Sequence, residues 1–522
     1  MKRVLPMNPS KWWLATQLLT SRIATFFPSE NRLHRGRYAY PHELKLLLSS
    51  TLDGMHLLLA EYFGQHILRV KTTPKRTKLG NMLICGPTGS GKSQHITSQL
   101  LTFPGSCVVY DIKGELYRLT AGYRAKLGPV YVLDPRGVGD PYDPFQGRLT
   151  ESKLYAAAKY LLYEPREGEG RAFAEKGMKM LTIVSLAGRE ANRKAGQAHA
   201  ALLPFVGLMA DLGLNRAANT IYTISPSLAR RFLDEEYNPD KDYTENKYLA
   251  NSWESVTARL YPLLTQEVLR MLAGASFTGR DLMRSEKPST VYLRLPEADL
   301  LALSPITRLV LDSLIHELIA TYDQAADTGE EDACRPVLFL IDEAGRTASL
   351  ASLPDHLTTV RSRGISLIVA IQTLSQLNAL YHDRAEDVIN NCLSQLYYQP
   401  FSYKTAAELA QWLGYKSEFA TSYSTHGAHQ TSEGRSEREV PLLSPDEIRL
   451  IGEDAVLVFQ PGIRPFLARR VNWHRFPLLK ERSAITPPPV PVLPALSESL
   501  PASAWRRQER WSQIPIDPDA IN

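Results

Sequence analysis

The sequence has 522 residues, of which 44% are hydrophobic and 22% are charged, as expected of a globular protein with two to four domains. Lys and Arg number 60 against 55 for Asp and Glu, a mild basic excess that is only weak support for a polyanionic partner. The four cysteines are scattered, which excludes a disulfide framework, and no spacing of cysteine and histidine is typical of a zinc site.

Residues 1–80 are predicted to form a helical segment followed by a basic lead-in. Their most apolar stretches, 12–27 and 46–59, are interrupted by polar residues and stay short of the roughly 18 apolar residues of a membrane-spanning helix. We therefore expect no transmembrane helix. Basic residues precede Trp12 and Trp13, a pattern that fits an interfacial membrane anchor or a helix packed on the core.

A phosphate-binding loop directly follows the apolar run 82–85, which predicts a strand. The loop consists of Gly86, Pro87, Thr88, Gly89, Ser90, Gly91, Lys92 and Ser93. Strand, glycine-rich turn and helix in this order direct backbone N–H groups and the positive end of a helix dipole at a phosphate. Lys92 is expected to reach the β- and γ-phosphates, and the Ser93 hydroxyl to bind Mg²⁺. The motif predicts binding of a nucleoside triphosphate.

From residue 81 onward, strands and helices alternate, which is typical of an α/β fold with a mainly parallel sheet. We expect strands at 107–110 and 130–133 and a helix at 115–127, within a first part of the nucleotide-binding domain at 81–151. Residues 152–279 show helical periodicity without a convincing strand, with helices expected at 153–162, 172–186, 200–214 and 253–272. This block predicts an inserted all-α domain.

The second part of the nucleotide-binding domain is expected at 280–480. Its apolar run 336–341 predicts a central strand buried on both faces, and it ends in Asp342 and Glu343. Carboxylates at the carboxyl end of such a strand project into the crevice where α/β sheets bind ligands. Asp342 is expected to hold Mg²⁺, and Glu343 to polarise the attacking water as a general base. Together with the loop, this pair predicts hydrolysis.

Further elements complete this part of the chain. We expect strands at 290–295, 366–371, 455–459 and 466–470, helices at 306–322 and 352–361, and a capping box that opens a short helix at Ser444. Residues 481–522 are rich in proline and are predicted to be a disordered tail, which carries Trp505, Arg506, Arg507 and Arg510.

Several motifs resemble those of the type IV coupling proteins, the TraG/TraD-like ATPases of conjugation and type IV secretion. The resemblance extends over residues 81–477. Besides the loop and the adjoining Gln94, it includes Asp111-Ile112-Lys113-Gly114-Glu115-Leu116, Ser276-Phe277-Thr278, Ile341-Asp342-Glu343, Gln372-Thr373-Leu374-Ser375-Gln376-Leu377 and Pro441-Leu442-Leu443-Ser444-Pro445-Asp446-Glu447-Ile448. The strand end at Asp111 is more specific than the glycine-rich loop, because few other P-loop ATPases carry it.

The resemblance implies a RecA-like P-loop NTPase that uses ATP and Mg²⁺ and assembles as a homohexamer. Such a motor receives single-stranded, relaxase-bound DNA from the relaxosome and feeds it to the components of a type IV secretion channel. It acts at the cytoplasmic face of the bacterial inner membrane. The family has paired N-terminal membrane helices that this sequence lacks, so attachment here would be peripheral or through a partner.

The resemblance also implies roles for single residues. The Gln372 amide would sense the γ-phosphate. Arg361, or alternatively Arg363, would act in trans as an arginine finger on the nucleotide of the neighbouring subunit. Lys113 and Glu115 would couple the sheet to that subunit. DNA would be gripped by basic residues of the inserted block. The candidates are Arg171, Lys176, Lys179, Arg189, Arg193 and Lys194.

Two alternatives stay open. One is a secretion ATPase that recruits effector proteins through the loop at 415–439 and the C-terminal tail. The other is a double-strand DNA translocase of the FtsK/HerA type, against which the motifs at 111–116 and 441–448 argue. In addition, Ala344, Gly345 and Arg346 follow Glu343 where the family has a bulky apolar residue.

Overall fold

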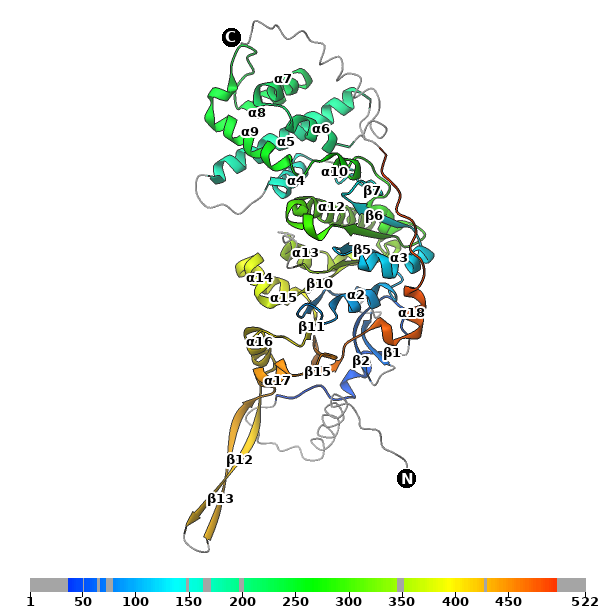
Figure 1. Ribbon diagram of the computed structural model, residues 1–522, viewed down its shortest axis with the longest axis vertical. Coiled ribbons are helices and arrows are strands. Elements are labelled where there is room, and N and C mark those ends of the chain that lie inside the picture. Colours follow the sequence, from blue (N-terminus) through cyan, green and yellow to red (C-terminus); the bar gives the residue numbers. More distant parts are fainter. Residues whose placement is uncertain are drawn as a thin grey trace. The chain divides into compact units, whose positions relative to one another are not determined.

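The computed structural model describes residues 36–49, 51–62, 66–71, 78–146, 150–162, 170–196, 201–344, 352–426 and 430–494 (Figure 1). The chain divides into two compact units. The first comprises Met1–Gly105, Pro336–Ser349 and Leu353–Ile485, and the second comprises Ser106–Arg335, Leu350–Ser352 and Thr486–Asn522. Trp12, Trp13, Gly345, Arg346 and the four tail residues Trp505, Arg506, Arg507 and Arg510 lie outside the described residues.

The first unit is built on a mixed sheet. Its strands are β1 (Leu48–Ser49), β2 (His56–Tyr62), β3 (His66–Lys71), β4 (Met82–Cys85), β9 (Val337–Ile341), β10 (Ile365–Ile371), β11 (Ser394–Tyr398), β14 (Ala455–Gln460) and β15 (Ile463–Arg469). Their order is β1-β3-β2-β15-β14-β11-β4-β10-β9. The four strands from β11 to β9 are parallel, and the others pair antiparallel. Every residue of β4, β9 and β10 is buried, as expected of strands covered on both faces.

Helices flank this sheet. They are α2 (Lys92–Leu100), α13 (Leu353–Thr359), α14 (Leu374–Tyr381), α15 (Ala385–Asn391), α16 (Tyr403–Leu413), α17 (Pro445–Arg449) and α18 (Pro477–Ser483), with 3₁₀ turns η1 (Glu43–Leu46), η5 (Arg361–Arg363), η6 (His382–Arg384) and η7 (Trp473–Arg475). The predicted capping box is confirmed, because the Ser444 and Glu447 side chains each accept a hydrogen bond from the other residue's backbone N–H.

A long hairpin joins α16 to α17, where the sequence predicts a loop. Its strands β12 (Tyr415–His426) and β13 (Gln430–Pro441) pair antiparallel over their whole length and extend away from the sheet (Figure 1). The loop prediction is therefore wrong. The hairpin has no apolar alternation to reveal it, because its residues are mainly polar.

The second unit combines a small sheet with a helical block. Strands β5 (Ser106–Asp111), β8 (Thr290–Arg294), β6 (Val130–Asp134) and β7 (Val138–Gly139) are neighbours in this order, and the first three are parallel. Helices α3 (Glu115–Leu127) and α12 (Leu300–Asp327) and the 3₁₀ turns η3 (Glu297–Asp299) and η4 (Glu331–Ala333) belong to the same unit.

The helical block contains α4 (Glu151–Leu162), α5 (Gly170–Lys194), α6 (Leu203–Ala210), α7 (Leu214–Ile224), α8 (Pro226–Leu233), η2 (Tyr243–Glu245), α9 (Lys247–Leu260), α10 (Gln266–Met271) and α11 (Gly279–Arg284). The described residues between α4 and α11 include no strand. The predicted fold class, a mainly parallel α/β sheet with an all-α region, is confirmed. The exact domain boundaries at 81, 152, 280 and 480 stay a prediction.

Two predictions about the ends of the chain are wrong. Helices were expected before residue 75, but residues 48–71 form β1, β2 and β3. Leu57, Leu58 and Leu59 favour a helix by propensity, yet β2 lies between two other strands, and burial overrides that preference. The tail was expected to be disordered from 481, but its described part, up to 494, is ordered. Leu493 is buried, and the Gly139 N–H donates to Pro491 O at 2.7 Å.

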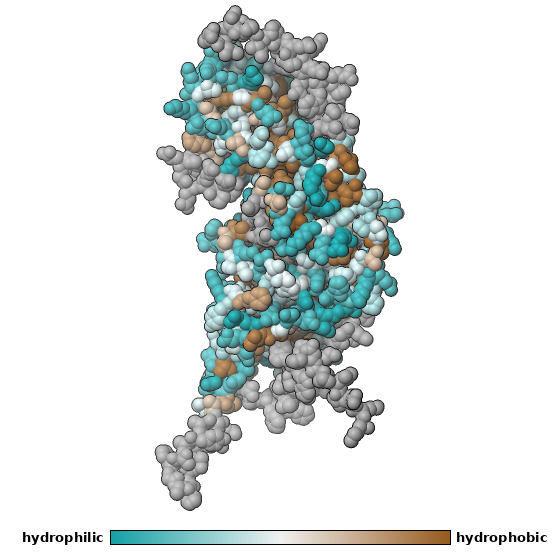
Figure 2. Space-filling view, in the orientation of Figure 1, coloured by the Kyte–Doolittle hydropathy of each residue, from teal (hydrophilic) through white to brown (hydrophobic). Residues whose placement is uncertain are grey.

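On the face shown in Figure 2, hydrophilic side chains cover most of the described surface, and hydrophobic ones gather in small groups. Searching the described residues finds no helix that is both long enough and apolar enough to span a bilayer.

Candidate functional site

The glycine-rich loop lies in the first unit, at the carboxyl edge of its parallel strands. Strand β4 enters the loop at Gly86, and helix α2 leaves it at Lys92. Because β4 is paired on both sides, by β10 and β11, its end is fixed. The Gly86 N–H donates to Ile371 O, the last carbonyl of β10, at 3.1 Å. The loop therefore starts from a rigid point of the sheet.

Three glycines shape the loop. A Cβ on Gly86 would lie 2.8 Å from the Tyr398 Cβ, so no side chain fits there. Gly89 and Gly91 have φ values of 80° and 100°, a region that favours glycine. Such turns can point successive N–H groups inward and form a concave anion site. The buried Ser90 Oγ has no hydrogen-bond partner among the described residues.

The Lys92 side chain folds back over the loop. It is buried, and its Nζ donates to Gly86 O at 2.7 Å and to Pro87 O at 3.0 Å. These two carbonyls hold a positive charge in the concavity of the loop. Phosphate oxygens are stronger acceptors for an ammonium than neutral carbonyls are. Lys92 is therefore placed to give up its hydrogen bonds to the two carbonyls and to bond a phosphate that enters the loop.

Ser93 and Asp342 meet although they are far apart in sequence. The Ser93 Oγ donates to Asp342 Oδ2 at 2.8 Å. Burial raises the pKa of the Asp342 carboxyl, and the Ser93 hydrogen bond opposes that shift. The Ser93 hydroxyl at the end of the P-loop and the Asp342 carboxylate that follows β9 are oxygen ligands of the kind that Mg²⁺ prefers. The residues predicted to hold Mg²⁺ therefore do lie together, and their donor set fits that ion.

Glu343 has an unusual backbone. Its φ of 55° is in the left-handed region, which costs a non-glycine residue about 1–2 kcal/mol. Its side chain is almost fully buried, and its N–H donates to Asp342 Oδ1 at 3.1 Å. Strain of this kind persists where the surroundings enforce it, often at functional sites. The assignment of Glu343 as general base stays a prediction.

Gln372 immediately follows β10, which pairs with both β4 and β9. Strand β10 is therefore adjacent to β9, the strand that ends just before Asp342. The Gln372 N–H donates to Gln376 Oε1 at 2.9 Å, which fixes the turn into α14. Gln372 therefore lies at the same edge of the sheet as the glycine-rich loop and Asp342. Its role as a γ-phosphate sensor stays a prediction.

Arg361 and Arg363 do not join this group. They lie in η5, before β10 begins, and hence at the opposite edge of the sheet. The seven residues of β10 span about 23 Å at ~3.3 Å per residue. The Arg363 guanidinium donates to Thr359 O at 3.1 Å. Neither arginine can serve the loop of its own chain, which leaves action on a neighbouring subunit as their predicted role.

The second unit contains the other predicted residues. The Asp111 Oδ2 accepts the Tyr117 N–H at 2.7 Å, so this carboxylate stabilises the first turn of α3, while Lys113 and Glu115 are exposed. Lys176 is buried, and its Nζ donates to Asp234 Oδ2 at 2.6 Å. The prediction that Lys176 grips DNA is wrong, because its charge is neutralised inside the helical block.

The remaining basic candidates of the helical block are not buried in this way. Lys179 is exposed, and Arg193 forms a surface ion pair with Glu190 at 2.6 Å. Arg189 is on the same helix, and the Lys194 Nζ donates to Ile224 O. The Arg171 side chain lies outside the described part. DNA contact by these residues stays a prediction.

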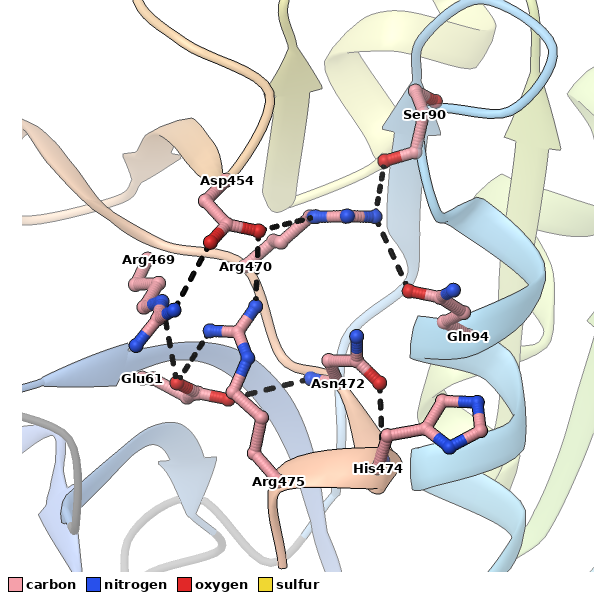
Figure 3. A network of polar contacts seen from close by, with 9 residues as sticks. All are labelled: Glu61, Ser90, Gln94, Asp454, Arg469, Arg470, Asn472, His474 and Arg475. Carbon is pink, nitrogen blue, oxygen red and sulfur yellow. Dashed lines mark hydrogen bonds and ion pairs between the residues drawn. The ribbon is translucent and has the colours of Figure 1, made fainter. Parts of the chain in front are cut away.

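Sequence reasoning missed Arg470, which touches the glycine-rich loop from outside. Its Nη1 donates to Ser90 O at 2.8 Å and to Gln94 Oε1 at 3.2 Å (Figure 3). The Gln94 side chain therefore points to Arg470. The only signal in the sequence is the pair Arg469-Arg470 at the end of an expected strand, and nothing local links it to the loop.

A strand, a glycine-rich loop and a helix, with the loop's serine against an acidic residue of a parallel strand, define a P-loop nucleotide-binding fold. Comparison with known protein families agrees with this class and identifies one family to which the chain belongs. The chain belongs to the family described as Type IV secretory system Conjugative DNA transfer, which it matches over residues 61–487.

Named relatives are distant but cover much of the chain. The protein VirD4 of Rhizobium radiobacter is 25% identical over 440 residues, which cover 79% of this chain and 60% of VirD4. The conjugal transfer protein TraG of Escherichia coli is 25% identical over 456 residues, covering 78% of this chain and 70% of TraG. The match thus spans about three fifths of the length of VirD4.

Solved structures show the same fold. The bacterial conjugative coupling protein TrwB, in a trigonal form with sulphate, superposes with a TM-score of 0.63 at 16% identity, over 85% of this chain and 95% of that structure. TrwB in complex with ADP and Mg²⁺ gives a TM-score of 0.60 at 15% identity.

Proposed function

We propose that this chain is a type IV coupling protein: an ATP-hydrolysing subunit of a homohexameric motor that recruits relaxase-bound DNA and drives its transfer through a conjugative type IV secretion channel. The observation that carries the proposal is the 2.8 Å contact between Ser93 and Asp342 beside the buried Lys92. Family membership supports the cellular role, and TrwB, which has the same fold, binds ADP with Mg²⁺.

The residues of the site divide the work. The loop N–H groups and Lys92 would bind the phosphates, and Ser93 and Asp342 would hold Mg²⁺. Mg²⁺ supplies charge neutralisation at the phosphate oxygens. The Glu343 carboxylate would accept a proton from the attacking water, and Gln372, at the same edge, would respond to loss of the terminal phosphate. Arg361 would stabilise developing negative charge on the nucleotide of an adjacent subunit.

Location and substrate are part of the proposal. We infer that the protein acts at the cytoplasmic face of the bacterial inner membrane. The family's description as conjugative DNA transfer, and a relative named conjugal transfer protein TraG, support transport of DNA over the alternatives.

The test measures the ATPase rate of the purified chain against protein concentration and DNA type. A rate that rises with protein concentration and is stimulated by single-stranded DNA supports the proposal. Indifference to both single- and double-stranded DNA favours effector recruitment, and stimulation by double-stranded DNA alone favours a duplex translocase. Lys92→Ala should lower turnover at least about a hundredfold while the chain stays folded. Unchanged turnover in this variant would show that the glycine-rich loop is not the site of ATP hydrolysis.

A further inference from the structure

A network of charged side chains connects the glycine-rich loop to distant parts of the first unit (Figure 3). Three guanidinium groups, those of Arg469, Arg470 and Arg475, surround the carboxylates of Asp454 and Glu61. The network therefore retains a net positive charge, and Arg470 is the member that reaches the loop. Neither family membership nor the mechanism above gives this residue a role.

The contact of Arg470 fixes one peptide plane of the loop. Its Nη1 donates to Ser90 O at 2.8 Å, outside the loop. In a trans peptide the C=O of one residue and the N–H of the next point in opposite directions. With the Ser90 carbonyl held outward, the Gly91 N–H of the same plane is directed to the other side, into the concavity that the loop forms. Arg470 thus sets the direction of a phosphate-binding donor.

The same guanidinium joins the loop to the helix that follows it. Besides Ser90 O, its Nη1 reaches Gln94 Oε1 in the first turn of α2, at 3.2 Å. Residue 91, next to this guanidinium, is a glycine. A Cβ there would collide with Arg470 Nη1, and the φ of 100° disfavours any other residue.

Arg470 is itself held in place. Its backbone N–H donates to Asp454 O at 2.8 Å, and its Nε donates to Asp454 Oδ1 at 3.3 Å. Only 13% of its side chain is exposed. Asp454 also accepts from Arg469 at 3.0 Å and from Arg475 at 3.1 Å. Burial works to raise the pKa of Asp454, but the arginines outweigh it and the pKa is lowered, so this carboxylate stays ionised.

The far end of the network is Glu61 on β2, whose side chain is 1% exposed. It accepts from Arg475 at 3.0 Å and from the Asn472 N–H at 3.4 Å. Arg475 therefore bridges Glu61 to Asp454, and the arrangement of Arg470 depends on side chains from β2 and from the segments that flank β14 and β15.

We propose that Arg470 is a positioning residue for phosphate binding, which holds the Ser90–Gly91 peptide so that the Gly91 N–H faces the nucleotide. The inference rests on the proposed nucleotide site. Arg470 touches only the outside of the loop, so its contribution is the same for the bound ground state and for the transition state. Its loss should raise KM for ATP and leave kcat almost unchanged.

The test compares Arg470→Met with Arg469→Met, a matched control that also loses a bond to Asp454 but never contacted the loop. The dissociation constant for Mg·ADP is measured by calorimetry on the full chain, with KM and kcat for ATP. Arg470→Met should weaken Mg·ADP binding and raise KM about tenfold or more, the size of one hydrogen bond to a charged group, with kcat within about twofold. Arg469→Met should change both by less than about twofold.

Other results have defined meanings. Equal shifts in the two variants, or unchanged binding in Arg470→Met, would overturn the positioning role while leaving the nucleotide site intact. A wild-type chain that takes up no Mg·ADP would contradict the proposed function itself. If Arg470→Met does not unfold cooperatively, Arg470→Lys replaces it. A lysine can still donate to Ser90 O but not to Asp454 and Gln94 together, so binding should fall between wild type and Lys92→Ala, and wild-type affinity would refute the proposal.

Discussion

Mixing two inactive variants tests whether Arg361 acts on a neighbouring subunit. Arg361 precedes β10 and the loop lies beyond its end, about 23 Å away, a distance that no arginine side chain spans. Arg361→Ala alone should therefore lose the contribution of a finger, about 10³-fold in kcat. Glu343→Gln should also be inactive, because it lacks the proposed general base, but its Arg361 is intact.

In a one-to-one mixture, a site is active when its owner keeps Glu343 and its neighbour keeps Arg361. Random assembly satisfies both conditions at about a quarter of the subunit interfaces, so the mixture should recover about a quarter of the wild-type rate if sites act independently. The assay is steady-state phosphate release, at a protein concentration high enough for the proposed ring to assemble. A mixture no faster than the mean of its parents would refute trans action. Arg363→Ala, put through the same mixing, serves as the control.

Two further predictions follow from buried carboxyl groups. Asp342→Asn should weaken the dependence of nucleotide affinity on Mg²⁺ by tenfold or more, because it removes the charged partner of Ser93; an unchanged Mg²⁺ dependence in a nucleotide titration would contradict the assigned ligand. Burial raises the pKa of Glu317 to about 7, above its ordinary value of 4.5. The contribution of this carboxyl to the free energy of unfolding is therefore greatest below pH 4.5. It falls by about 3 kcal/mol as the pH rises through 7, because the buried group must then ionise. In Glu317→Gln the amide oxygen can accept the Gly279 N–H and the amide nitrogen can donate to the Tyr142 hydroxyl oxygen, so both neighbours keep a neutral partner. This variant should raise the melting temperature at pH 8 and flatten its pH profile; a profile parallel to that of the wild type would count against the prediction.

The local parts of the site were predictable from sequence. A phosphate-binding loop is formed by consecutive residues between a strand and a helix, so one short sequence segment contains all the residues that identify it. The strand that ends at Asp342 was equally visible, because burial on both faces leaves a continuous apolar run. Both predictions depend on neighbours along the chain.

The parts of the site that depend on tertiary contacts were not predictable. Arg470 and Ser90 are 380 positions apart, and no local pattern links them. The left-handed backbone of Glu343, with a φ of 55°, is not favoured by its residue type, so no sequence pattern indicates it. Strand β2 was misread for the same reason, because its leucines favour a helix until other strands enclose them.

Equilibrium binding of Mg·ATP tests the central claim most directly, because every proposed role depends on the loop and the Ser93–Asp342 pair. The full chain is titrated with a fluorescent Mg·ATP analogue, beside Lys92→Ala as the matched variant. We expect saturable binding at one site per chain, weakened by at least about tenfold in Lys92→Ala. Failure of the wild-type chain to saturate, or equal binding by both proteins, would contradict it.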